Sequence, residues 1–175
     1  MKTFLTIATL ATLASPALAH STFEQTEMVQ GQTTRLTLRV PHGCGAEATL
    51  RVRVAIPDGL AGVQPMMHPG WTLETITGPL AAPYTAHGRT VTEGVREIIW
   101  SGELPSAFYD EFVFRAVATD LLPVDAPVYI PVVQECATGA ARWIEIPAAG
   151  QDPHSLASPA PGLTVVAPGH HGHGH

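Results

Sequence analysis

Alternating apolar and polar residues mark two early segments of the chain as β-strands. In residues 33–40, Leu36, Leu38 and Val40 alternate with polar side chains, which is the period of a half-buried strand. Residues 49–56 repeat this alternation and are followed by a Pro-Asp-Gly turn. The apolar positions expected to face inward in the second segment are Leu50, Val52, Val54 and Ile56.

The rest of the chain continues as short apolar segments between turn residues. Residues 78–89, rich in Gly and Pro, are expected to form a long connection, and Pro131 predicts an edge or bulged strand. Seven or eight strands at roughly regular spacing, without a helical period after residue 20, predict an all-β, antiparallel β-sandwich of immunoglobulin-like or cupredoxin-like type. Periodicity leaves these two types open. The further strands are expected at residues 21–26, 71–77, 95–100, 110–119, 128–135 and 141–146.

Residues 1–19 have the three parts of a secretory signal. Lys2 is the basic region, residues 4–13 are apolar, and Ala17-Leu18-Ala19 fits the small-x-small cleavage rule. The apolar stretch is too short to anchor the chain in a bilayer. We expect cleavage after Ala19 and a periplasmic or secreted protein that begins with His20. The alternatives are an uncleaved N-terminal helix and cleavage one or two residues away.

The mature chain has the length of one domain. We expect residues 20–150 to form the sandwich and residues 151–175, dominated by Pro, Ala, Ser and Gly, to form a flexible linker and tail. The 9 Lys and Arg residues fall to 8 without Lys2, against 15 Asp and Glu, and this acidic balance argues against nucleic acid as a partner. No membrane span is expected after signal cleavage. The tail holds four histidines, His170, His171, His173 and His175.

The chain has two cysteines, Cys44 and Cys136. An oxidising compartment permits a disulfide, which would close a loop of roughly 90 residues. The alternative is a pair of thiolate metal ligands, for which the absence of a Cys-x-x-Cys spacing is unfavourable. Both cysteines follow predicted strand ends, so a bridge between them is expected to join two strand ends or loops at one pole.

The expected first residue, His20, carries candidate metal chemistry. A free α-amine and the Nδ1 of the same imidazole form a chelate suited to Cu(II), which prefers nitrogen ligands. The alternative is an incidental histidine at a terminus. The tail histidines are candidates for an auxiliary arm that gathers Cu(II), Ni(II) or Zn(II) weakly. Met66-Met67-His68 has soft ligands for Cu(I), although adjacent residues on a strand point to opposite faces.

A series of motifs resembles the YcnI-like domain family. The resemblance covers about residues 20–147 and is most specific at residues 90–102 and 109–114. It implies an exported bacterial protein with an immunoglobulin-like sandwich that handles copper through an N-terminal histidine brace, with a tryptophan beside the metal. By motif, the brace falls on His20 and the tryptophan on Trp143. The motifs that carry the resemblance are Val-Pro at 40–41, Ile-Pro-Asp-Gly at 56–59, Pro-Gly-Trp at 69–71, Thr-Val-Thr-Glu-Gly-Val-Arg-Glu-Ile-Ile-Trp-Ser-Gly at 90–102, Tyr-Asp-Glu-Phe-Val-Phe at 109–114, Val-Val-Gln-Glu-Cys at 132–136 and Arg-Trp-Ile-Glu-Ile-Pro at 142–147.

The chain departs from the family pattern in the loop after Val40-Pro41. The resemblance implies a carboxylate ligand there, but the expected position holds no acid. His42 is the nearest candidate ligand and Glu47 the next, and neutral imidazole suits Cu(II). The alternative for His42 is a surface loop residue, and for Trp143 it is a core tryptophan.

No catalytic motif stands out: the sequence has no Gly-x-Ser-x-Gly, phosphate loop or His-Glu-x-x-His. We therefore expect a non-enzymatic copper-binding protein, a chaperone or buffer that exchanges copper with periplasmic or membrane copper-handling proteins. Two alternatives remain open at this point. One is a structural sandwich with incidental histidines, and the other is a copper-dependent oxidase that uses His42 as a second histidine ligand.

Overall fold

The computed structural model describes residues 20–169, so the expected signal sequence and the tail histidines lie outside the described residues. Within residues 20–169 the chain forms twelve strands and one 3-10 helix. The strands are β1 (Thr22–Phe23), β2 (Glu27–Val29), β3 (Thr33–Val40), β4 (Thr49–Ala55), β5 (Leu60–Pro65), β6 (Thr72–Ala86), β7 (Arg89–Leu104), β8 (Asp110–Ala118), β9 (Pro127–Tyr129), β10 (Val132–Cys136), β11 (Ala140–Trp143) and β12 (Gly162–Val166), and the helix is η1 (Pro153–Ser155).

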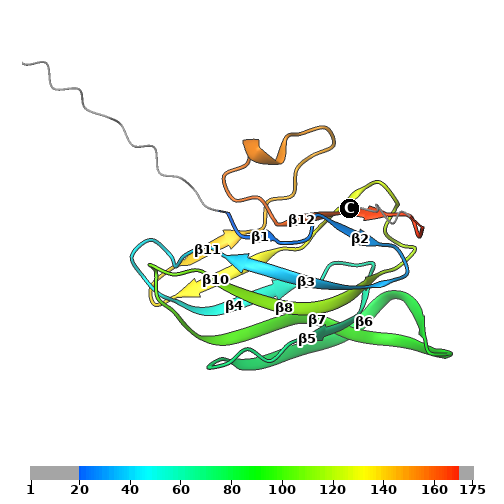
Figure 1. Cartoon of the computed structure of the whole chain (residues 1–175), viewed down its shortest axis with the longest axis horizontal. Coiled ribbons are helices and arrows are strands. Elements are labelled where there is room, and N and C mark those ends of the chain that lie inside the picture. The colour runs from blue at the N-terminus through cyan, green and yellow to red at the C-terminus, as the bar shows by residue number, and fades with distance from the viewer. Residues whose placement is uncertain (1–19, 170–175) are drawn as a thin grey trace, which may run out of the picture.

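Two antiparallel sheets pack face to face and a third, smaller sheet joins them. One sheet has the order β1-β3-β8-β5 and the other β11-β10-β4-β7-β6, while the third has the order β2-β12-β9. In the third sheet β12 runs parallel to β2 and antiparallel to β9. Figure 1 shows the long β6–β7 ribbon on one side of the molecule and the β11–β12 connection on the other. The prediction of an all-β, antiparallel β-sandwich is confirmed for the two large sheets, although residues 20–169 form twelve strands where seven or eight were expected.

The core lies between the two large sheets. The alternation in β3 buries Leu36, Leu38 and Val40 completely. Trp100 of β7 and Phe112 of β8 are equally inaccessible, and their ring centroids are 5.3 Å apart, so these side chains join the two sheets. Burial of such large apolar side chains, each worth about 1.5–3 kcal/mol, is the main stabilising contribution here.

The expected connection at residues 78–89 is wrong. β6 continues to Ala86 and pairs with β7 along its length, with His87-Gly88 at the turn. Pro79 and Pro83 fit this arrangement because β6 is an edge strand, where a missing N–H need not break the ladder. The register shift between Pro79 and Tyr84 accommodates the irregular segment.

Residues 151–169, the described part of the flexible linker and tail expected at residues 151–175, are folded. The end of this segment forms β12, whose Leu163 and Val165 are buried in the core between β2 and β9. Residues 153–155 form η1, and Asp152 caps this helix. The ordered domain therefore extends beyond residue 150, because two apolar side chains of a short segment fill space that the third sheet provides.

Smaller differences concern single positions. Leu50 is 41% exposed, since a bulge between Thr49 and Arg51 shifts the alternation of β4, whereas the next three apolar positions of residues 49–56 are buried as expected. Pro131 lies in the step between β9 and β10, and β10 is an interior strand. Within residues 20–169, no helix has the length and apolar composition that crossing a membrane requires.

Candidate metal site

His20 lies against Trp143 at the start of the described chain. The two ring centroids are 5.5 Å apart at an interplanar angle of 61°, an edge arrangement. His20 is partly exposed, whereas Trp143 is 5% exposed and belongs to the core cluster. β1, which begins two residues after His20, is fixed by its antiparallel pairing with β3. The sandwich therefore holds His20 beside the buried indole of Trp143.

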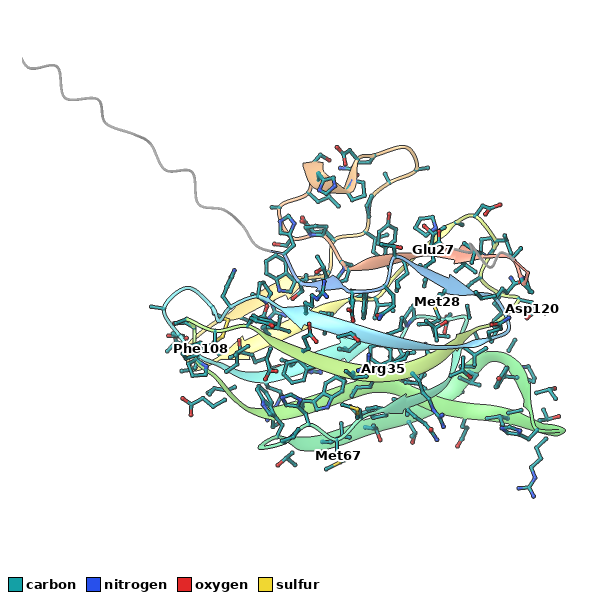
Figure 2. The ribbon with its side chains drawn as sticks, in the orientation of Figure 1. Glu27, Met28, Arg35, Met67, Phe108 and Asp120 are labelled. Atoms are coloured by element: carbon teal, nitrogen blue, oxygen red, sulfur yellow. A yellow bond between two sulfur atoms is a disulfide. The ribbon has the colours of Figure 1, made fainter. Side chains whose placement is uncertain are left out.

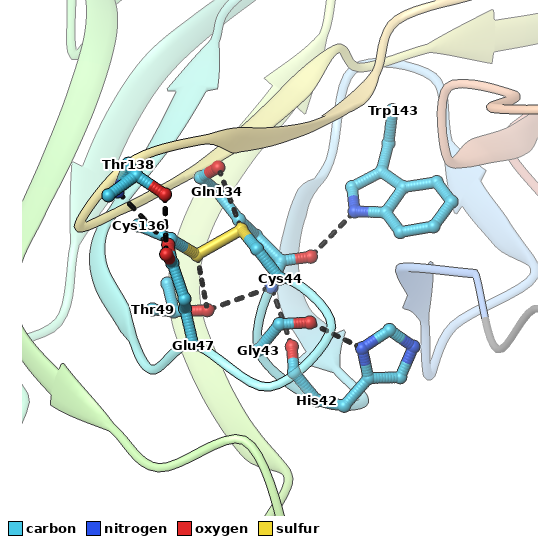
Figure 3. Close-up of a disulfide and its surroundings, with 9 residues drawn as sticks. All are labelled: His42, Gly43, Cys44, Glu47, Thr49, Gln134, Cys136, Thr138 and Trp143. Carbon is cyan, nitrogen blue, oxygen red and sulfur yellow. Dashed lines mark hydrogen bonds between the residues drawn. A yellow bond between two sulfur atoms is a disulfide. The ribbon is translucent and has the colours of Figure 1, made fainter.

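A buried glutamine connects Trp143 to the loop that carries His42. The Trp143 Nε1–H donates to Gln134 Oε1 at 2.6 Å, and Gln134 Nε2 donates to the His42 carbonyl at 2.7 Å and to Thr49 Oγ1 at 3.0 Å. Gln134 is completely buried, so its amide bonds are shielded from water. Figure 3 shows this link. Because Gln134 bonds to both, the position of the Trp143 indole and the position of the loop that carries His42 depend on each other.

The His42 ring has a defined tautomer when it is neutral. Its Nδ1 lies 2.6 Å from the Gly43 carbonyl oxygen, which can only accept a hydrogen bond. Nδ1 therefore carries the proton and Nε2 keeps a free lone pair, the arrangement that prepares an imidazole for a metal. In Figure 3 the His42 ring and the Trp143 indole extend to the same side of the loop.

Glu47, the other candidate ligand in the loop, is engaged elsewhere. Its carboxylate accepts hydrogen bonds from the Thr138 hydroxyl and from the Thr138 backbone N–H at 3.0 Å. These bonds lower the pKa of Glu47 below its ordinary value. Figure 3 shows the carboxylate directed to Thr138, on the disulfide side of the loop.

The predicted disulfide between Cys44 and Cys136 is present. It joins the β3–β4 loop to the last residue of β10, and the two Cα atoms are 6.2 Å apart. The loop is also closed by paired backbone bonds between Cys44 and Glu47, of 3.0 and 3.1 Å. Gly43 is required within it, because a Cβ there would lie 2.0 Å from the Glu47 carbonyl oxygen. His42 therefore lies in a short loop that the disulfide holds covalently.

A groove opens on another side of His20; we call it the N-terminal groove. It has a volume of about 490 Å³ and lies between residues 20–26, the start of β12, and η1. Ser21 and His154 line it together with His20. Across residues 20–169, no three His, Cys, Asp or Glu side chains are grouped closely enough to hold a metal ion.

The remaining candidates are placed away from His20. Trp71 and Trp100 are core residues. Met66-Met67-His68 follows β5 in a loop, with Met67 68% exposed (Figure 2), while His68 Nε2 pairs with Asp110 at 2.9 Å. Sequence reasoning did not single out Gln134, Ser21 or His154. The only signal for Gln134 was a polar residue within the apolar run of residues 128–135.

The comparisons with known proteins agree with the fold. A solved structure described as an uncharacterized protein from Nocardia farcinica with an immunoglobulin-like fold matches with a TM-score of 0.59 and 24% identity, covering 84% of this chain and 98% of that chain. The molecule is therefore an immunoglobulin-like β-sandwich protein. A family model described as "Domain of unknown function (DUF1775)" matches residues 20–165, and the chain belongs to this family, the one that the YcnI-like motifs indicate. No curated protein matches the chain.

Proposed function

We propose that the chain is an exported copper-binding protein, a chaperone or buffer that holds Cu(II) through the amine and imidazole of a mature N-terminal His20. The observation that carries the proposal is the position of His20, the expected first mature residue, against the buried indole of Trp143. The small-x-small signal before it and the disulfide both fit an oxidising compartment outside the cytoplasm.

The donor set fits copper. Removal of residues 1–19 would give His20 an α-amine that can chelate together with Nδ1 of its own ring, and Cu(II) leads the divalent series in affinity for such nitrogen ligands. Among residues 20–169, no three His, Cys, Asp or Glu side chains are close enough to hold a metal ion. The proposed site therefore relies on the α-amine of His20 as an additional nitrogen ligand. When bound, the copper would be held and handed on, and Trp143 would shield one side of it.

His42 is the favoured second protein ligand. Its Nδ1 is committed to the Gly43 carbonyl, which leaves Nε2 for a metal, and the disulfide and Gln134 fix its loop. Glu47 has its carboxylate committed to Thr138. These contacts support imidazole in place of the carboxylate that the family resemblance implies. His170, His171, His173 and His175 are proposed as an auxiliary collecting arm, and deletion of residues 169–175 should lower copper stoichiometry while leaving the tight site.

Isothermal titration with Cu(II) of the protein that begins at His20 tests this assignment. We expect one tight site, with affinity reduced roughly 10- to 100-fold or more in His20→Ala and His42→Ala. Glu47→Gln, in the same loop, is the matched control and should bind as the unsubstituted protein does. Equal Cu(II) affinity in the unsubstituted protein and the three variants would contradict the proposal and favour a structural sandwich with incidental histidines. Ascorbate-driven turnover of the copper-loaded protein would instead favour an oxidase.

A further inference from the structure

The outer face of the β1-β3-β8-β5 sheet carries two arginines directly opposite each other. Arg35 of β3 is the cross-strand partner of Arg115 of β8 in the antiparallel register. Both arginines are exposed, whereas the adjacent Leu36 and Phe114 are buried in the core, as alternation along a strand requires. Figure 2 labels Arg35 on this sheet. Like charges directly opposite each other destabilise a sheet, so a group of opposite charge between them would be stabilising.

Neither arginine has an acidic partner within residues 20–169, although the chain has 15 Asp and Glu against 9 Lys and Arg. Arg35 Nη1 donates to Thr37 Oγ1 at 2.9 Å, and Arg115 Nε donates to Gln64 Oε1 at 2.8 Å. These partners are neutral, and a guanidinium has five N–H donors, so both arginines keep charge and donors for an anion. The arginines that do form ion pairs are Arg39, Arg51, Arg53 and Arg96.

A pocket of about 480 Å³ lies at these two arginines, and we call it the Arg35–Arg115 pocket. Val113 lies two residues before Arg115 on the same face of β8 and is 8% exposed, and Met66 is 49% exposed. Apolar surface therefore adjoins the two charges. The volume falls in the range of small-molecule sites, roughly 300–1,000 Å³. The remaining lining residues are Thr33, Gln64, Pro65 and Phe114.

We propose that the Arg35–Arg115 pocket binds a small organic anion, which consists of an oxyanion group and a short apolar body. The oxyanion accepts hydrogen bonds from both guanidinium groups, whose planar arrangement of donors matches carboxylate and phosphate oxygens. Its negative charge offsets the repulsion between the opposed arginines, and the apolar body packs on the apolar lining. Neither His20 nor His42 lines this pocket, so the inference is independent of the proposed copper site.

Isothermal titration of the protein that begins at His20 with hexanoate and with hexyl phosphate tests the inference. The two probes share an apolar body, so the tighter one identifies the oxyanion as carboxylate or phosphate. Arg35→Gln and Arg115→Gln should each weaken binding of that probe roughly tenfold or more. Arg89→Gln removes the same charge from the exposed end of the β6–β7 hairpin and should bind as the unsubstituted protein does. Absence of binding by both probes, or equal weakening in all three variants, would overturn the inference.

Two further arms test the apolar part of the ligand. Hexanol, which lacks the oxyanion, should not bind measurably, and Met66→Ala should weaken the tighter probe roughly three- to tenfold. Binding of hexanol as tight as that of hexanoate, or unchanged affinity in Met66→Ala, would contradict the assigned ligand class. An oligoglutamate peptide that binds through Arg35 and Arg115 while both hexyl probes fail would overturn the small-ligand assignment in favour of an acidic segment of a partner protein.

Discussion

The indole Nε1–H of Trp143 donates to Oε1 of Gln134 over 2.6 Å in the interior of the sandwich. The same amide reaches the carbonyl of His42 through its nitrogen at 2.7 Å. The buried Gln134 side chain thus positions both the Trp143 indole beside His20 and the loop that contains His42. Any change in Gln134 is expected to affect both at once.

Gln134→Ala should lower the free energy of unfolding by about 2–4 kcal/mol, because it leaves the indole N–H and the His42 carbonyl buried without partners. Urea unfolding followed by circular dichroism measures this loss. Gln32→Ala, an exposed glutamine before β3, is the control and should stay within about 0.5 kcal/mol of the unsubstituted protein. A similar small effect for Gln134→Ala would contradict the bridging role.

Removal of the disulfide should be costly. Cys44 and Cys136 are 92 residues apart, and a loop of this length corresponds to about 4–5 kcal/mol in the chain-entropy model. The Cys44→Ala/Cys136→Ala double variant should therefore unfold at clearly lower denaturant concentration, and the reduced unsubstituted protein should match it. Equal midpoints for the oxidised protein and the double variant would show that the bridge adds no stability.

Gly102 packs directly beneath the Trp71 ring. A Cβ there would lie 2.4 Å from Trp71 Cδ2, so Gly102→Ala should displace the indole and destabilise the protein by about 1–3 kcal/mol. Gly139→Ala is the matched control, because a Cβ at Gly139 meets nothing within 4 Å. Thermal unfolding of both variants is the measurement, and equal melting temperatures would rule out the steric conflict.

The surface cluster around Glu135 predicts a pH dependence. Hydrogen bonds from Arg53, and secondarily from Arg51, lower the pKa of Glu135 below its ordinary value of 4.5. Since the folded-state pKa is the lower one, this stabilisation is present above about pH 4.5 and is lost as the pH falls further. The three side chains are 30–48% exposed, so solvent limits the contribution to about 0.5–1 kcal/mol.

Glu135→Gln should therefore be less stable than the unsubstituted protein at pH 7 by about that amount, and the difference should shrink below pH 4. Urea unfolding at pH 7, 5 and 3.5 measures it. Glu27→Gln serves as the control, since Glu27 is exposed and forms no ion pair within residues 20–169. A difference that grows on acidification would reverse the assigned sign.

The strands with clean alternation could be predicted from the sequence, and those with irregular composition could not. β3 places the buried Leu36, Leu38 and Val40 at alternate positions, and β4 does the same with Val52 and Val54. β6 was missed beyond residue 77 because Gly78, Pro79 and Pro83 resemble loop residues, and only its position at a sheet edge makes them acceptable. β12 was missed because its five residues gain stability from two neighbouring strands that sequence patterns do not place.

Of the candidate site, the disulfide beside it could be predicted from the sequence, whereas the metal ligands stay a prediction. Signal processing and cysteine count indicated His20 and the disulfide, and the disulfide is present. The role of Gln134 depends on a hydrogen bond across 92 residues of sequence, which no local pattern encodes. His20 and His154 line the same groove although more than 130 residues separate them in the sequence. Hydrogen bonds of a buried side chain such as Gln134 form only when the sheets pack together, so the sequence alone does not predict them.

The most direct test of copper binding through the amine and imidazole of His20 compares two proteins that differ by one residue. One begins at His20 and the other carries a single alanine before it, which keeps every side chain but moves the free amine off the histidine. Cu(II) titration with electron paramagnetic resonance should show a tight, nitrogen-rich site in the first and a weaker, altered one in the second. Identical affinity and identical spectra in the two proteins would contradict the account.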